Sequence, residues 1–188
     1  MLSCARGQRT YMHWIDMANA ALIPADATAF KFRFHAIVQS PGRWELRSTA
    51  KRNPDAKVEL FIEAQEKGAH YDFLCPDETM SLETIEDFRF QLDPANYTYE
   101  SGVLTGQLDP SHSFLEQLTE TVRYGGRLLF DGGQWRTCGV SGNSECLRPV
   151  PEGAVLELRL VSTRGRLNVI EYATNYGPRG RMMTIPAE

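Results

Sequence analysis

The sequence lacks most of the short motifs that identify a reaction. It has no run of about 20 apolar residues, the length that a membrane-spanning helix requires. Its four cysteines form no C-x-x-C pair and its four histidines are scattered, so no metal site is predicted. Glycine-rich phosphate loops, the nucleophile motif G-x-S-x-G and the calcium-loop spacing D-x-D-x-D-G are also missing. No cofactor is therefore expected.

A secretory signal is not visible either. The opening stretch MLSCARGQRT contains no apolar core before a cleavage site. A cytoplasmic location with reduced thiols is therefore expected. On this view Cys138 and Cys146 stay free, whereas they could close a small loop in an exported protein.

Charge is distributed unevenly along the chain. The net charge is −4, yet residues 58–122 alone hold two basic and fourteen acidic side chains. A chain that is acidic overall is a poor partner for the phosphate backbone, so nucleic-acid binding is not predicted. The acidic middle is instead a candidate docking surface for a protein partner, because charge of one sign steers association. Its candidate residues are Asp77, Glu78, Glu83, Glu86 and Asp87.

Alternating apolar and polar residues are the dominant pattern. The segment FKFRFHAIV alternates three phenylalanines with Lys31, Arg33 and His35, which is the two-residue period of a half-buried strand. The stretches KVELFIE, HYDFLC, DFRFQLD and AVLELRLVS repeat this pattern, with turn residues between them. The stretch NYTYESGVLTGQL predicts a hairpin that turns at Ser101 and Gly102. The fold class is therefore mainly β, an antiparallel β-sandwich or β-barrel.

Helical signals are confined to two places. Asp109 can cap a helix over 110–124, Pro110 suits its first position, and Gly125 suits its end. Apolar residues at helical spacing over 10–22 predict a second, short helix. The chain is accordingly divided into an N-terminal helical extension (1–27), a single β-rich domain (28–174) and a flexible C-terminal arm (175–188).

The segment 139–153 is predicted to be a mobile loop. Its first half consists of small and polar residues that bury little apolar surface, so little opposes chain entropy. Pro149 and Pro151 in its second half cannot donate to a strand ladder.

Two hypotheses about function follow. The first is a non-catalytic binding protein that contacts a protein partner through the acidic surface, since no catalytic motif is present. The alternative is a cofactor-independent cyclase, isomerase or lyase with an aromatic-lined barrel pocket for a small apolar or aromatic ligand. The candidate pocket residues are His35, Tyr97, Tyr99 and Trp135, with Arg33 as an anchor for an anionic group. The sequence leaves open which hypothesis holds and whether the chain forms oligomers.

Overall fold

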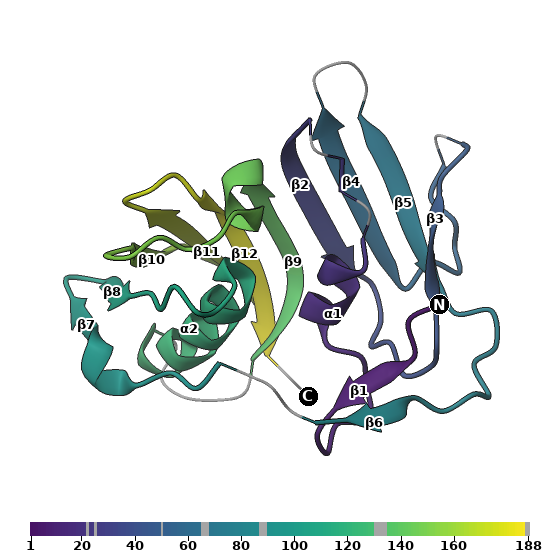
Figure 1. The fold of residues 1–188 in the computed structure, drawn as a ribbon, viewed down its shortest axis with the longest axis horizontal. Coiled ribbons are helices and arrows are strands. Elements are labelled where there is room, and N and C mark those ends of the chain that lie inside the picture. Colours follow the sequence, from purple (N-terminus) through teal and green to yellow (C-terminus); the bar gives the residue numbers. More distant parts are fainter. Residues whose placement is uncertain are drawn as a thin grey trace. The chain divides into compact units, whose positions relative to one another are not determined.

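The chain folds as two units in the computed structural model, residues 1–88 (unit 1) and 89–188 (unit 2) (Figure 1). The structure describes residues 1–21, 23–24, 26–49, 51–64, 68–86, 90–129 and 135–186, without the side chains of Arg127 and Leu129. Within these residues it confirms the predicted mainly-β, antiparallel fold with a long helix and a short N-terminal helix.

Unit 1 contains an antiparallel sheet and a short helix. Its elements are β1 (Cys4–Arg6), α1 (Trp14–Asn19), β2 (Ala27–Phe34), β3 (Arg43–Leu46), β4 (Val58–Ala64), β5 (Ala69–Leu74) and β6 (Glu83–Ile85). The sheet has the strand order β3-β5-β4-β2, and β1 pairs with β6 in a separate parallel ladder. Trp14 of α1 packs against the rings of Phe32 and Phe34, with centroids 6.3 and 6.2 Å away. The alternate apolar residues of β2 therefore face the helix, as their period predicts.

The opposite side of this sheet, which we call the outer face of unit 1, carries charged side chains. Arg33 in β2 lies directly opposite Glu59 in β4, and Glu59 lies opposite Asp72 in β5. Because successive strand residues point to opposite faces, these three side chains project from the side away from α1. The register thus places residues that are distant in sequence next to one another.

Unit 2 also combines an antiparallel sheet with a helix. Its elements are η1 (Pro94–Asn96), β7 (Tyr97–Glu100), β8 (Val103–Gln107), α2 (Phe114–Leu129), β9 (Trp135–Asn143), η2 (Ser144–Leu147), β10 (Val155–Arg164), β11 (Leu167–Thr174) and β12 (Arg179–Pro186). The strand order is β9-β12-β11-β10-β8-β7. Phe114 of α2 contacts the ring of Tyr172 in β11, and fully buried apolar side chains fill the layer between helix and sheet. The β7–β8 hairpin turns at Ser101 and Gly102, both with positive φ, as predicted.

Helix α2 begins later and ends later than predicted. Asp109 accepts hydrogen bonds from Ser111 in a turn before the helix, and Ser113 and Glu116 form the capping box instead. Gly125 lies inside the helix, where it is buried, so it does not end the helix. The sequence RLLFDGGQWRT also predicts a hairpin with its tip at 131–133, and this tip lies outside the described residues.

A buried carboxamide, Gln117, ties the turn before α2 to the helix. Its Oε1 accepts a hydrogen bond from the backbone N–H of Asp109 at 2.7 Å. Its Nε2 donates to the carbonyl oxygens of Asp109 and His112, at 2.8 and 3.1 Å. Gln117 is fully buried, so these bonds satisfy a polar group that would otherwise be costly inside the unit.

The mobile loop predicted over 139–153 is wrong in its first half. Residues 139–143 belong to β9, which pairs with β12 along its length, and η2 follows with Cys146 buried. The small residues serve close packing between strands, since Gly142 lies opposite Gly180 in β12. A Cβ on Gly180 would lie 2.0 Å from the carbonyl oxygen of Ser141. Low apolar content here reflects close backbone approach and not flexibility.

The flexible arm predicted over 175–188 is corrected in the same way. Residues 179–186 form β12, which pairs with β9 on one side and β11 on the other. Met182 and Thr184 are buried on one face, whereas Arg181 is exposed on the other. This alternation is typical of a strand. In the sequence, the neighbouring glycines and prolines favour a flexible segment instead, which is why the strand was not predicted.

We expect Gly180→Ala to destabilise the protein by about 1–3 kcal/mol, because the added methyl group meets a backbone oxygen that cannot rotate away. Urea denaturation followed by circular dichroism measures the change. Val161→Ala, at an exposed position of β10, is the control and should change stability by less than about 0.5 kcal/mol. Equal stability of Gly180→Ala and the wild type would contradict the close approach of β9 and β12.

Candidate functional site

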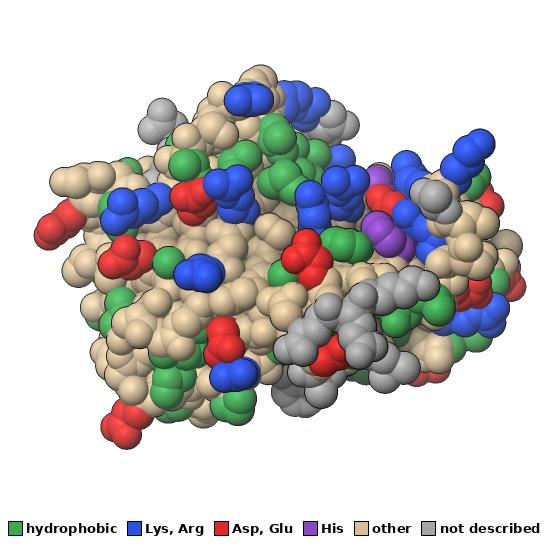
Figure 2. Space-filling model, turned by 90° about the horizontal axis from the view of Figure 1, so that it is seen from above, with side chains coloured by type: hydrophobic (Ala, Val, Ile, Leu, Met, Phe, Trp, Pro, Cys, Tyr) green, Lys and Arg blue, Asp and Glu red, His purple; other side chains and the backbone are tan. Residues whose placement is uncertain are grey.

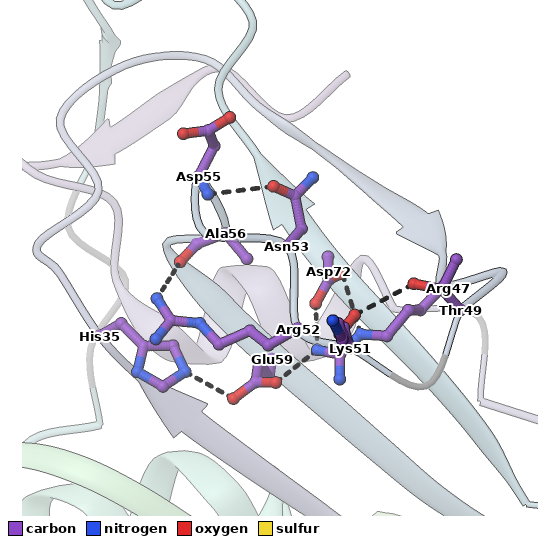
Figure 3. Close-up of polar contacts among 10 residues, drawn as sticks. All are labelled: His35, Arg47, Thr49, Lys51, Arg52, Asn53, Asp55, Ala56, Glu59 and Asp72. Atoms are coloured by element: carbon purple, nitrogen blue, oxygen red, sulfur yellow. Dashed lines mark hydrogen bonds and ion pairs between the residues drawn. The ribbon is translucent and has the colours of Figure 1, made fainter.

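A connected group of four charged or titratable side chains occupies the outer face of unit 1: His35, Arg47, Glu59 and Asp72 (Figure 3). We call it the ion-pair cluster. His35 directly follows β2, Arg47 directly follows β3, and Glu59 and Asp72 lie on β4 and β5. Each member therefore has its backbone held in or beside a strand of the same sheet.

The four side chains are joined by a series of contacts that runs from His35 to Asp72. His35 Nε2 lies 2.6 Å from Glu59 Oε2. The other Glu59 oxygen accepts a hydrogen bond from Nη2 of Arg47. Arg47 also donates to both oxygens of Asp72, from Nε to Oδ2 at 3.0 Å and from Nη2 to Oδ1. The two facing carboxylates, Glu59 and Asp72, thus share one guanidinium group.

The exposed fraction of the side chains rises along this series of contacts, from Asp72 to His35. The side chains of Asp72 and Arg47 are 5% and 9% exposed, Glu59 is 14% exposed, and His35 is 27% exposed. A ligand approaching from solvent would therefore meet the imidazole first. The buried members serve as its support.

Charge on the cluster is fixed by its hydrogen bonds. Burial alone would raise the pKa of the Glu59 carboxyl, but the bonds from Arg47 and His35 outweigh it and lower this pKa. Hydrogen bonding to Asp72 raises the pKa of Arg47. Glu59 is therefore ionised at neutral pH and acts as an acceptor toward Nε2–H of His35. This tautomer leaves Nδ1 of a neutral His35 with a lone pair, the state required of a general base.

The pKa shift of Glu59 predicts a pH-dependent contribution to stability. A carboxyl whose pKa is lower in the folded state stabilises the fold above its unfolded pKa of about 4.3, and this contribution is lost as pH falls through the folded pKa. We expect Glu59→Gln to melt below the wild type at about pH 7, with a gap that narrows below about pH 5. Thermal unfolding across this range measures it, with Glu157→Gln on β10 as control. A gap of constant size would contradict the role of the charge.

Arg33 lies on the outer face of unit 1 with His35, whereas the three aromatic pocket candidates lie in unit 2 and do not converge there. Tyr97 is buried: its ring packs against Gly106 and its hydroxyl lies 3.0 Å from Oγ1 of Thr121. Tyr99 on the same strand is 45% exposed. Trp135 begins β9, at the opposite end of the strand order from β7. Tyr97 is therefore a packing residue within unit 2.

The acidic candidates for partner binding are mostly exposed. Asp77 accepts hydrogen bonds from the backbone and side chain of Thr79, and Glu78 forms an ion pair with Lys57 at 2.5 Å. Glu83 lies on β6 and Glu86 follows it, both exposed. Asp87 lies outside the described residues.

Sequence reasoning found His35 but missed the residues that hold it. Glu59 alternates with buried Val58 and Leu60, so its place on the outer face was readable from the strand pattern. Its partner Arg47 lies one residue beyond β3, where no periodicity marks its direction. Only the strand register brings Glu59 and Arg47 together.

A second unforeseen feature is a buried hydroxyl in unit 2. Thr184 is 1% exposed and its Oγ1 has no hydrogen-bond partner among the described residues. We expect Thr184→Val, which keeps the shape and removes the hydroxyl, to raise the free energy of unfolding by about 1 kcal/mol. Thr121→Val is the matched contrast and should be destabilising, because that buried hydroxyl bonds to Gln117 and Tyr97. Denaturant titration of both variants tests the pair, and a loss of stability in Thr184→Val would contradict the assignment.

No protein-family model matches the sequence, and no curated protein sequence shows significant similarity to it. Solved structures do resemble the fold. A protein from Thermobifida fusca YX, provisionally named thioesterase II, gives a TM-score of 0.50 at 12% identity, covering 96% of this chain and 88% of that one. The likeness shows the fold. Its identity is too low to carry residue roles across.

Two further structures resemble the chain less. The tesB protein from Mycobacterium avium subsp. paratuberculosis gives a TM-score of 0.49 at 8% identity, covering 93% of this chain and 83% of that one. A protein of unknown function from Alicyclobacillus acidocaldarius, described as having a hot dog fold, gives 0.44 at 9% identity, covering 93% and 84%.

The comparison with the T. fusca protein contradicts the first hypothesis about function. The T. fusca protein of the same fold bears the name of an enzyme, which contradicts a non-catalytic interaction protein. The alternative hypothesis, a cofactor-independent enzyme, fits better. Among the described residues, no helix has the length and apolar character required to cross a bilayer.

Proposed function

We propose that the chain is an enzyme that hydrolyses an acyl thioester, with His35 as its general base. The observation that carries the proposal is the 2.6 Å contact between His35 Nε2 and Glu59, which leaves Nδ1 available at the exposed end of the ion-pair cluster. A histidine held by a carboxylate in this way is a common acid–base arrangement.

The chemistry requires one acid–base group and water. Nδ1 of His35 takes a proton from a water molecule as the water oxygen attacks the thioester carbonyl carbon. Glu59 stabilises the imidazolium that forms. The C–S bond then breaks, the imidazolium returns the proton to the leaving sulfur, and the products are a carboxylic acid and a thiol. The proposal keeps the cofactor-independent chemistry of the alternative hypothesis and replaces its reaction class with hydrolysis.

The choice of thioester is supported by the fold. The likeness to the T. fusca protein extends over nearly the whole of this chain, and that protein is named as a thioesterase. We also place the protein in the cytoplasm, where its four free thiols would stay reduced.

The test is a panel of acyl thioesters of increasing chain length, with the released thiol detected by a colorimetric thiol reagent. We expect release above the rate without enzyme for at least one chain length, with saturation at high substrate. A parallel assay follows elimination of water from a 3-hydroxyacyl thioester by absorbance. Elimination without thiol release would replace hydrolysis by a lyase reaction, and no turnover in either assay would reject the proposal.

A further inference from the structure

Two guanidinium groups beside His35 are left without a carboxylate. The Glu59 and Asp72 oxygens are occupied by His35 and Arg47. Arg33 and Arg52 are both exposed, and neither forms an ion pair with a described residue. The two carboxylates of the ion-pair cluster are therefore already paired, and neither of them bonds to Arg33 or Arg52.

Arg33 is positioned by the sheet. It lies directly opposite Glu59 across the β2–β4 ladder and two residues before His35, so its side chain and the imidazole leave the same face of the chain. Phe34, between them, points to the opposite side and contacts Trp14. Arg33 thus flanks the ion-pair cluster from the β2 side.

Arg52 is positioned by a turn. The N–H of Asp55 donates to Asn53 Oδ1 at 3.0 Å, and the N–H of Ala56 donates to the Asn53 carbonyl at 3.1 Å. Nη2 of Arg52 donates to the Ala56 carbonyl at 3.4 Å, which bends the side chain back over the sheet. Figure 3 shows the guanidinium group of Arg52 beside the His35 ring. Its remaining N–H groups are available to a ligand.

Further basic side chains lie nearby. Lys31 precedes Arg33 by two residues on the outer face, and Lys51 precedes Arg52. Figure 2 shows Lys and Arg side chains gathered about the histidines over unit 1. An anion that reaches this surface therefore finds two arginines, Arg33 and Arg52, close to His35.

We propose that Arg33 and Arg52 form a binding site for a phosphate group next to His35. Guanidinium groups present paired N–H donors that match phosphate oxygens, and two of them balance the charge of a phosphate dianion. The site goes beyond the proposed function and does not depend on it, since binding is measurable without turnover. Where the phosphate belongs to a substrate, the site also places that substrate against the imidazole.

The first experiment is a titration of the full chain with inorganic phosphate at constant ionic strength, followed by calorimetry. We expect Arg33→Gln and Arg52→Gln each to weaken binding about tenfold, which corresponds to about 1.4 kcal/mol, since each change removes hydrogen bonds to a charged group. The matched control is Arg43→Gln, an exposed arginine of the same unit that pairs with Glu45. Loss confined to the first two variants supports the site. No binding by the wild type, or equal loss in all three variants, overturns it.

The second experiment separates free phosphate from a phosphate-bearing substrate. Hydrolysis is compared for two thioesters with the same acyl chain, one with a phosphate on its thiol portion and one without. A rise in KM in Arg33→Gln and Arg52→Gln for the phosphorylated thioester alone assigns the site to the substrate. Unchanged KM together with weakened phosphate binding assigns it to free phosphate. Lack of turnover rejects the proposed function and leaves the calorimetric result as the test of the site.

Discussion

Replacement of His35 by Asn will lower kcat/KM for thioester hydrolysis by roughly 10²–10⁴, the usual contribution of a general acid–base group. Asn keeps a polar side chain that can still bond to Glu59, but it cannot accept a proton. His35 is at the exposed end of the ion-pair cluster, so the fold should tolerate the change. Steady-state kinetics on the best thioester of the panel, with circular dichroism as a check on folding, measure the effect.

His70→Asn is the matched control for this variant. His70 packs against Phe61 in a tilted arrangement, with ring centroids 4.5 Å apart, and no ion pair joins it to a described residue. We expect its kcat/KM to stay within about threefold of the wild type, since His70 has no carboxylate to hold it. Equal losses in both variants, or full activity of His35→Asn, would show that His35 is not the base.

Replacement of Arg47 by Met will destabilise the protein by about 3–5 kcal/mol, because it leaves two buried carboxylates without their counter-ion. The Asp72 side chain is buried, so water cannot replace the lost hydrogen bonds. The penalty should shrink in acid, where the Glu59 carboxyl takes up a proton and loses its charge. Urea denaturation at neutral and at acidic pH measures both effects.

Arg43→Met provides the comparison, since this exposed ion pair with Glu45 should contribute less than about 1 kcal/mol. A loss in Arg47→Met no larger than in Arg43→Met would mean that the ion-pair cluster is solvated and does not support His35. A loss that persists unchanged in acid would point to packing of the aliphatic part of Arg47 in place of charge.

Strand periodicity predicts much of this fold, because burial on one face repeats every second residue. It places Phe30, Phe32 and the residues of β4 and β10 correctly without any knowledge of pairing. It fails at positions where the residue type is required by contact with a neighbouring strand. Gly142 and Gly180 indicate flexibility when each is taken alone, and they are required for close approach when paired.

In the candidate site too, some residues can be predicted from the local pattern and others only from strand pairing. His35 could be selected from its place at the end of an alternating segment. Arg47 and Asp72 could not, because nothing local distinguishes them from other charged residues on a wet face. Their roles depend on the ladder β3-β5-β4-β2, which brings them within hydrogen-bond distance. Tyr97 and Tyr99 share a strand parity yet differ in burial, since Tyr97 packs against Thr121 and Tyr124 of α2, contacts that no strand pattern reveals.

The Gln117 carboxamide has a consequence for local opening of the chain. The amide hydrogen of Asp109 lies in an exposed turn before α2, yet its acceptor is a side chain fixed in the first turns of that helix. Exchange of this hydrogen with solvent deuterium therefore requires the start of α2 to open, or Gln117 to withdraw. The turn and the helix share one opening event, so the amide of Asp109 reports the local stability of a helix to which it does not belong.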